Sequence, residues 1–377
     1  MSPSLIPTEG LGKAIEDAYP ELAPIAATAA APVYLVGGAV RDLLLGRGRA
    51  DIDLVVVGDA AELAAALGAA QSTEHQRFRT AKAVIDGHWV DIAAARSESY
   101  PAPGALPVVE SAADIEADLG RRDFTINAMA VPLHGATELI DPHGGRADLE
   151  AGRIRVLHAG SLRDDPTRAL RAARYAARFG FEPVPETAAL FREADLDTVS
   201  ADRRRAELTR IASEPEAVGA LALLAEWGLV DIRPGGLELA TRVSELLAGP
   251  PWEGFAPPAD AILAAALGPS GAAEEIAALA PDRPSDAVEA TAGRGPVELA
   301  LARAMGADWL DRYLLEWRDV ALEIDGGDLL AAGVPEGPAV GRGLNQALRL
   351  KLDDRLSGRD EELRAALEAA RGGDGVA

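Results

Sequence analysis

The sequence predicts an α+β protein in which a unit built on a mixed sheet is followed by a chain that is helical to its end. Short β-type runs lie before Asp148, and beyond Leu149 alanine, leucine and arginine recur with the helical period. Clusters of proline and glycine then divide the helical part. We therefore expect three segments, residues 1–148, 149–230 and 231–377.

The first segment supplies the strands. Each run is short, apolar or alternating, and bounded by turn residues, and short helices lie between some of the runs. The expected strands are Val33–Val36, Ile52–Val57, Ala83–Ile85, His88–Ala94 and Phe124–Val131.

The later segments supply helices. Gly180 and Gly228 follow two of the periodic runs, at the place where a left-handed residue commonly ends a helix. The helices expected before residue 230 are Pro166–Phe179, Pro185–Glu193, Ala201–Ala212 and Ala217–Trp227.

Composition narrows the class of protein. The chain has no cysteine, which excludes disulfides and cysteine-based zinc sites. The five histidines show no metal-ligand spacing, which argues against a phosphohydrolase domain. The first ten residues lack a basic region followed by an apolar core, and no apolar run is long enough to span a membrane. We expect a cytoplasmic protein without a membrane partner.

The charge is unevenly distributed. A net charge of −23 argues at first against nucleic acid, because lysine and arginine dominate phosphate binding. Residues 121–210, however, hold 15 arginines against 14 acidic residues, leaving 22 basic against 46 acidic residues elsewhere. Arginine forks match phosphates and base edges well, although an arginine-rich genome explains their number equally well. Basic charge is thus concentrated in one segment.

A glycine pair marks a candidate phosphate site. Gly37-Gly38 follows the strand Val33–Val36 and precedes a helix-like run, so the pair lies at a strand-to-helix turn. Backbone amides at such a turn can face a phosphate. A Gly-Gly turn on its own is more often only a turn, because glycine tolerates positive φ.

Three aspartates are candidate metal ligands or catalytic groups. Asp51 and Asp53 project from one face of their strand, and paired carboxylates suit Mg²⁺, which takes the rest of its ligands from substrate phosphates. Asp91 lies in a second strand and would complete a triad. The alternative for all three is a solvated strand face.

Four strings in a fixed order give the chain a specific resemblance: Gly37–Asp42, Asp51–Asp53, Arg121–Ala130 and Asp164–Tyr175. It resembles the class II tRNA nucleotidyltransferase and bacterial poly(A) polymerase family, most strongly from Val33 to about Leu229. Residues 333–341 also resemble the family's tail, whereas residues 231–325 show no motif.

The resemblance implies a polymerase-β-like nucleotidyltransferase head, a helical neck that selects the nucleotide, and a helical body and tail that bind tRNA. It implies that Asp51 and Asp53 bind Mg²⁺ and that Asp91 is a third catalytic carboxylate near the primer hydroxyl. Asn127 would hold local backbone rather than touch substrate. The implied nucleotide-binding residues are Gly37, Gly38, Arg41, Arg122, Asp123, Asp165, Arg168, Arg171 and Arg174.

Asp165 and Arg168 are implied to read the base. Cytosine and adenine both present an amine donor beside a ring-nitrogen acceptor, whereas uracil and guanine present a carbonyl beside an N–H. One carboxylate and one guanidinium three residues apart on a helix therefore fit C and A alike. The alternative is that Asp165 only caps the helix that begins at Pro166. The family usually has glutamate where this chain has Asp164.

The expected function is Mg²⁺-dependent addition of C and A, from CTP and ATP, to the 3′ end of tRNA. Alternatives within the family are a poly(A) polymerase and a partial enzyme that adds only CC or only A. An alternative from another class is a non-catalytic RNA-binding protein on the same fold. The sequence leaves open the monomer and the homodimer, the number of nucleotides added, and how addition stops.

Overall fold

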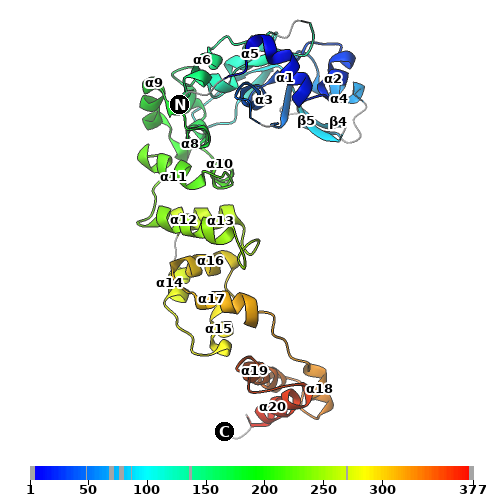
Figure 1. Cartoon of the computed structure of the whole chain (residues 1–377), viewed down its shortest axis with the longest axis vertical. Helices are drawn as coiled ribbons and strands as arrows, with labels where there is room; N and C mark the ends of the chain where they lie inside the picture. The colour runs from blue at the N-terminus through cyan, green and yellow to red at the C-terminus, as the bar shows by residue number, and fades with distance from the viewer. Residues whose placement is uncertain are drawn as a thin grey trace. The chain divides into compact units, whose positions relative to one another are not determined.

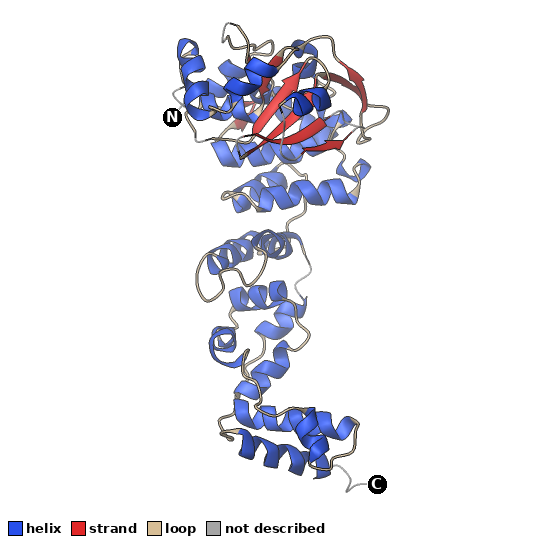
Figure 2. Ribbon diagram, turned by 90° about the vertical axis from the view of Figure 1, so that its right-hand side faces the viewer, coloured by secondary structure: helices blue, strands red, loops and turns tan. Residues whose placement is uncertain are grey.

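The computed structural model describes residues 5–47, 49–67, 72–75, 80–85, 87–135, 138–268 and 271–372. The chain forms two compact units, Met1–Asp231 and Ile232–Ala377. Strands occur in the first unit, and the described residues of the second unit are helical or in loops (Figures 1 and 2). No helix within these described ranges is both long and apolar enough to cross a membrane.

The first unit is built on a six-stranded mixed sheet. Its strand order is β3-β4-β5-β2-β1-β8. The pair β2/β5 is parallel, and the other neighbouring pairs are antiparallel. Its strands are β1 (Val33–Val36), β2 (Ile52–Val56), β3 (Ser72–His75), β4 (Thr80–Ile85), β5 (His88–Ala94) and β8 (Ala130–Pro132). The mixed sheet expected from the sequence is confirmed.

The alternation of side chains divides the sheet into two faces. One face carries Leu35, Ile52, Leu54, Val90 and Ile92, and it packs in the main core with the helices α1 to α4. On the opposite face, a smaller apolar cluster covers β1 and β2 where they meet α5. These helices are α1 (Leu11–Ala18), α2 (Leu22–Thr28), α3 (Gly38–Leu44), α4 (Ala60–Ala66) and α5 (Ile115–Gly120).

Two expectations about strands were wrong. Residues 124–131 do not form one strand: Phe124 makes an isolated bridge to Val156, residues Thr125–Asn127 form a 3-10 turn, and only then does β8 begin. The run is fully buried, so its apolar character did not distinguish a strand from a buried turn. The segment 149–230 is also not wholly helical, because β9 (Arg153–Ile154) pairs in parallel with β10 (Glu182–Pro183).

Helices make up most of the remaining first unit. The expected helices are present, with Pro185–Glu193 divided between α9 and a 3-10 turn. Gly180 ends α8 with φ 68°, as its position predicts. A separate hairpin, β6 (Arg96–Ser99) and β7 (Val108–Ser111), precedes α5. The helices are α6 (Gly145–Glu150), α7 (Ser161–Asp164), α8 (Thr167–Phe179), α9 (Pro185–Leu190), α10 (Ala201–Ala212) and α11 (Ala217–Glu226).

The second unit contains helix pairs with small apolar cores. Trp252 is buried and donates a hydrogen bond through Nε1 to Asp311 Oδ1 at 2.8 Å. Near the end of the chain, Leu329, Ala347 and Ala366 form a separate cluster. Its helices are α12 (Gly236–Leu247), α13 (Pro258–Leu267), α14 (Gly271–Ala277), α15 (Pro284–Thr291), α16 (Pro296–Met305), α17 (Trp309–Arg312), α18 (Gly326–Ala331), α19 (Pro338–Leu352) and α20 (Arg359–Arg371).

Candidate active site

The turn between β1 and α3 depends on glycine. Gly37 has φ 66° and ψ −127°, a conformation that residues with a Cβ rarely adopt. A Cβ on Gly37 would also lie 2.8 Å from Nη1 of Arg122. Gly38 then begins α3. The expected strand-to-helix turn is confirmed, and it brings the backbone close to an arginine.

A cavity of about 570 Å³ beside this turn collects many of the predicted site residues. Its lining is mainly polar and comes from the turn after β1, from α3, from β2 and the loop before it, from the segment before β8, and from α8. The predicted residues that line it are Gly37, Gly38, Arg41, Asp51, Asp53, Arg122, Asp123 and Arg174. Asp91, Asp165, Arg168 and Arg171 do not belong to this lining.

Asp51 and Asp53 lie at the start of β2. Asp51 precedes the strand and is exposed, and Asp53 is the second residue of the strand and is half-buried. Both line the same cavity, as the alternation of the strand predicts. Tertiary folding therefore places two carboxylates opposite the arginines of α3 and α8.

The pKa of Asp53 indicates that burial makes the charge of this carboxyl unfavourable. Burial raises this pKa to about 6; the charge of Arg122 opposes the rise, and the carboxylates of Asp91 and Asp51 add to it. A nearby cation would relieve this cost. In the described part of the chain, no three carboxylate or imidazole groups are arranged to hold a metal by themselves. Asp51 and Asp53 fit Mg²⁺, which takes one or two carboxylates and completes its shell with phosphate oxygens and water.

Asp91 lies beside Asp53 on the neighbouring strand. The parallel pairing of β2 and β5 places these two residues in register. Nζ of Lys82 lies 3.3 Å from Oδ2 of Asp91, and both side chains are about half exposed. Asp91 lines a second cavity, of about 510 Å³, which shares Asp53 and Arg122 with the first. The third carboxylate thus adjoins the pair.

Arg41 is buried and held by its neighbours. Its Nε donates to Asp42 Oδ1 at 2.8 Å, and its Nη1 donates to Asn127 Oδ1 at 2.5 Å. Its guanidinium also lies over the rings of Tyr175 and Phe179, at 5.1 and 4.7 Å from their centres. Asn127 therefore holds two side chains, Arg41 and Asp123, rather than backbone alone.

Arg122 and Asp123 lie between the sheet and α8. Nη2 of Arg122 donates to Asp118 Oδ2 at 3.0 Å. Asp123 accepts hydrogen bonds from the Phe124 amide and from Asn127, at 2.8 and 2.9 Å. Burial alone would raise the pKa of Asp123, but the charge of Arg171 and the Asn127 hydrogen bond outweigh burial and lower it. Asp123 is therefore a stable anion at neutral pH.

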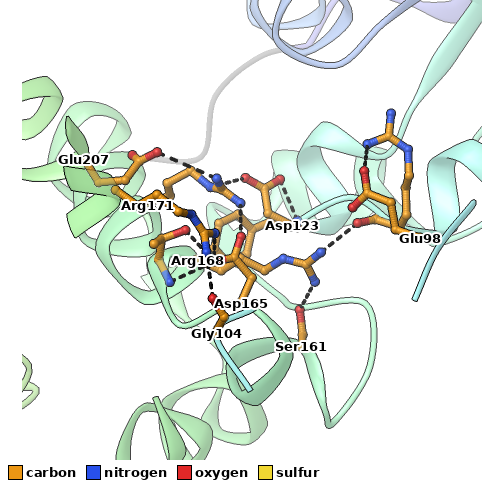
Figure 3. A network of polar contacts seen from close by, with 12 residues as sticks. Glu98, Gly104, Asp123, Ser161, Asp165, Arg168, Arg171 and Glu207 are labelled. Carbon is orange, nitrogen blue, oxygen red and sulfur yellow. Dashed lines mark hydrogen bonds and ion pairs between the residues drawn. The ribbon is translucent and has the colours of Figure 1, made fainter. Parts of the chain in front are cut away.

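Arg171 is the centre of a buried ionic network (Figure 3). Its guanidinium lies 3.1 Å from Asp123, 3.7 Å from Asp165 and 3.8 Å from Glu207. Glu207 comes from α10, so the network joins three parts of the first unit. Arg171 was predicted to contact nucleotide, and in this structure its charge is directed at these carboxylates.

Asp165 and Arg168 are also engaged within the protein (Figure 3). Oδ1 of Asp165 accepts from the amide of Thr167 at 3.1 Å and from its hydroxyl at 2.6 Å, at the start of α8, whose N-cap residue is Pro166. Arg168 donates to Ser161 Oγ at 2.5 Å and to the Arg121 carbonyl at 2.7 Å. Arg168 lines a third cavity, of about 340 Å³, away from Asp51 and Asp53. The pair does not point into the cavity of the aspartates.

The sequence reasoning missed several residues that line the first cavity, and two of them belong to the helix that carries Arg174. Tyr175 and Arg178, both on α8, line it beside Arg174. Nη2 of Arg178 lies 3.6 Å from Oδ2 of Asp42, the residue that follows Arg41. Arg178 is four residues after Arg174, and that helical spacing is the signal that would have found it.

Arg203 was also missed as a contact of the predicted base-reading pair. Its Nη2 lies 3.0 Å from Asp165 Oδ1, and its Nη1 donates to the Gly104 carbonyl at 2.8 Å. It therefore ties Asp165 to the loop that follows β6. Nothing local to Arg203 in the sequence marks this contact, because its partners are 38 and 99 residues away.

A mixed sheet that presents a glycine turn and paired aspartates to an arginine-lined cavity defines a nucleotidyltransferase-type site. The model of the Poly A polymerase head domain matches residues 33–155. A CC-adding tRNA nucleotidyltransferase from Deinococcus radiodurans is 36% identical over 351 residues, which cover 90% of this chain and 89% of that protein. The chain belongs to the tRNA nucleotidyltransferase family.

Other relatives differ in the nucleotides named for them. An A-adding tRNA nucleotidyltransferase from Geobacter sulfurreducens is 31% identical, and the match covers 90% of this chain but 45% of that protein. A Thermotoga maritima CCA-adding enzyme complexed with tRNA is 28% identical with a TM-score of 0.72, covering 96% of this chain and 98% of that one. A CCA-adding enzyme complexed with ATP is 27% identical with a TM-score of 0.76, covering 97% and 98%. The predicted family and fold class are confirmed.

Proposed function

We propose that this tRNA nucleotidyltransferase adds C and A residues from CTP and ATP to the 3′ end of tRNA, in a Mg²⁺-dependent reaction that releases pyrophosphate. The observation that carries the proposal is the single cavity that joins Gly37-Gly38, the carboxylates of Asp51 and Asp53, and the guanidiniums of Arg41 and Arg174. This cavity offers cations for a triphosphate and carboxylates for a metal within one space. The structures of similar CCA-adding enzymes with ATP and tRNA support the same substrates.

The reaction is an in-line displacement at the α-phosphate. The RNA 3′ oxygen forms a bond to the α-phosphorus while the bond to pyrophosphate breaks. Gly37 and Gly38 let the backbone approach the phosphates, and Arg122 and Arg174 neutralise their negative charge. Arg41 supports these phosphate-facing residues from its buried position. Preorganised positive charge lowers the barrier because it needs no rearrangement when charge develops.

Asp51 and Asp53 would hold Mg²⁺, and Asp91 lies on the side from which the RNA hydroxyl approaches. The bound ion would stabilise negative charge on the transferring phosphoryl group. The raised pKa of Asp53 supports this assignment, since a cation would favour the ionised form of that carboxyl.

Base selection is assigned to Asp165 and Arg168. In the present conformation Asp165 is bonded to Thr167 at the start of α8, and Arg168 is bonded to Ser161 and to the Arg121 carbonyl. Reading a base therefore requires Arg168 to leave these partners. When no nucleotide is bound, the hydrogen bonds to Thr167, Ser161 and the Arg121 carbonyl would return the two side chains to this position.

The segments beyond the head are assigned to selection and to tRNA binding. Residues 149–230 carry the arginines of α8 and α10, and we assign nucleotide selection to them. We assign tRNA binding to residues 231–377, of which 232–377 form the second unit.

A partial CC-adding activity is the second candidate. The CC-adding relative from Deinococcus radiodurans, similar over nearly the whole chain, favours it. The test uses tRNAs that lack three, two or one 3′ nucleotides, each supplied with CTP, ATP or both. Extension of all three to one common length supports full CCA addition. A stop after two C residues supports the CC-adding enzyme.

The same assay separates the remaining alternatives. Addition of many A residues with ATP alone would identify a poly(A) polymerase. Addition of A only to tRNA that lacks one nucleotide would identify an A-adding enzyme. No incorporation, with tRNA still bound, would leave an RNA-binding protein on this fold.

A further inference from the structure

The face of β4 and β5 beside the catalytic aspartates carries an exposed aromatic and a cation. Ala81, Ala83, Val90 and Ile92 of these strands are buried in the main core. The alternate residues point to the other face and are partly or largely exposed. This open face comprises Thr80, Lys82, Val84, Trp89, Asp91 and Ala93. None of the catalytic roles assigned above uses Lys82 or Trp89.

Strand register aligns this face with the site. The pairings place Lys82 opposite Asp91, and Asp91 opposite Asp53, so the three residues form one row across β4, β5 and β2. Trp89 lies on the same face of β5 as Asp91, two residues before it. β2 and β5 are parallel with Ile52 opposite Val90, so Trp89 lies towards the end of the sheet that carries Asp51.

The side chains of this face touch one another. Lys82 Nζ lies 3.3 Å from Asp91 Oδ2 and 5.5 Å from the centre of the Trp89 ring. The Trp89 side chain is 50% exposed, which makes it an unusually accessible tryptophan. The Lys82 side chain is 47% exposed, so its ion pair with Asp91 is weak and can be exchanged for another anion.

The open face continues into the active site. The second cavity is lined by Thr80, Lys82 and Asp91 from this face, by Arg121, and by Asp53 and Arg122, which it shares with the glycine-turn cavity. The two cavities therefore adjoin at Asp53 and Arg122.

The geometry of in-line displacement determines which substrate approaches through the second cavity. The attacking oxygen and the leaving pyrophosphate lie on opposite sides of the α-phosphorus. In the proposed reaction, the glycine turn and Arg174 bind the triphosphate in the first cavity. The attacking RNA then approaches from the second cavity, which residues of β4 and β5 line.

We propose that this face binds the last unpaired nucleotides of the RNA primer, with Trp89 stacking on a base and Lys82 contacting a backbone phosphate. This inference rests on the proposed nucleotidyl transfer. An exposed ring beside a cation is the combination that recognises single-stranded nucleic acid, because every base has a π-face and every linkage carries a phosphate. Lys82 exchanges Asp91 for the phosphate, which frees Asp91 to face the 3′ hydroxyl.

The test compares variants that keep or remove the ring. Trp89→Phe keeps a stacking surface, whereas Trp89→Leu keeps apolar bulk without a ring. The probe is a tRNA that lacks three 3′ nucleotides and ends in 2-aminopurine, whose fluorescence falls on stacking. With the full chain and no nucleotide present, wild type and Trp89→Phe should quench the probe, and Trp89→Leu should not. In incorporation assays, the KM for tRNA should rise about 5- to 150-fold in Trp89→Leu, while the KM for CTP stays constant.

Lys82 has its own readout. Loss of one phosphate contact to a single strand lowers the slope of log affinity against log salt by about 0.7. Lys82→Ala should show this smaller slope with the tRNA probe. Lys13→Ala, an exposed lysine on α1, is the matched control and should keep the wild-type slope.

The outcomes are separable from those of the proposed function. Equal quenching and equal tRNA KM in Trp89→Leu and wild type would overturn the stacking platform, even if the enzyme adds nucleotides normally. If the wild-type protein adds no nucleotide, the proposed function is overturned. Quenching of the probe by that protein would still show whether Trp89 stacks on a base. An unchanged salt slope in Lys82→Ala would overturn the phosphate contact.

Discussion

Replacing Arg171 by alanine should destabilise the first unit strongly, whatever else it does to nucleotide binding. The guanidinium lies 3.1 to 3.8 Å from Asp123, Asp165 and Glu207, and the Arg171 side chain is only 24% exposed. Removing one partner of a buried charge pair costs about 3–5 kcal/mol, because the remaining charges stay buried and unpaired. Since Arg171 is partly hydrated, we expect the lower end, about 3 kcal/mol. For a unit of this size that corresponds to a fall in Tm of about 6–12 °C.

The loss should depend on pH in a defined direction. The pKa of Asp123 is lowered in the folded protein, with the Arg171 charge as the main favourable cause against burial. A lowered carboxyl pKa contributes stability above the ordinary carboxyl range, and that contribution is lost as the pH falls through the lowered pKa. The difference between wild type and Arg171→Ala should therefore shrink below about pH 4. Urea unfolding of the full chain, followed by circular dichroism at several pH values, measures it.

Arg210→Ala is the matched control. Arg210 also pairs with Glu207, at 2.5 Å, but its side chain is 61% exposed. Arg210 is largely hydrated and the buried Glu207 keeps Arg171 as a partner, so the loss should be at most about 1 kcal/mol and this variant should unfold closer to wild type than Arg171→Ala. If Arg171→Ala also unfolds like wild type and only the KM for nucleotide rises, Arg171 is a substrate contact and the network reasoning is refuted.

Three further predictions concern the site itself. Asp53→Asn should abolish incorporation but leave tRNA binding nearly intact, and without metal it should raise the free energy of unfolding at pH 7 by about 1–3 kcal/mol. The sign follows because the folded pKa of about 6 lies above the ordinary value of 3.8, so wild type loses stability as pH rises between them, and the gain should vanish below about pH 4. Gly37→Ala, measured by unfolding and by kcat/KM, should cost about 1–3 kcal/mol and most of the activity, since its φ of 66° is strained for a residue with a Cβ and the added Cβ would displace Nη1 of Arg122; wild-type behaviour would contradict this. Arg168→Ala and Asp165→Asn should each lower selectivity for CTP and ATP over UTP and GTP by about one to two orders of magnitude. Asparagine still caps a helix, so unchanged kcat/KM ratios in Asp165→Asn would leave the cap as the role of Asp165.

Local patterns in the sequence were sufficient for many elements. The strands Val33–Val36 and His88–Ala94 and the helix Ala201–Ala212 have the bounds that their periodicity predicts. The Gly37-Gly38 turn was predictable because glycine tolerates positive φ, and that tolerance depends only on the residue type. The structure of residues Phe124–Val131 was not predictable in this way, because the residues of a buried turn are as apolar as those of a buried strand.

The sequence also determined which residue types are available for chemistry: Asp51 and Asp53 share a strand face by alternation, and the arginines of α8 share a helix face by spacing. Only the tertiary structure decided how they are used. The parallel pairing of β2 with β5 places Asp91 and Lys82 beside Asp53, and the packing of α7 and α8 directs Arg168 to Ser161 instead. These contacts depend on which distant segments pack together and exclude water, and no local period of the chain encodes that choice.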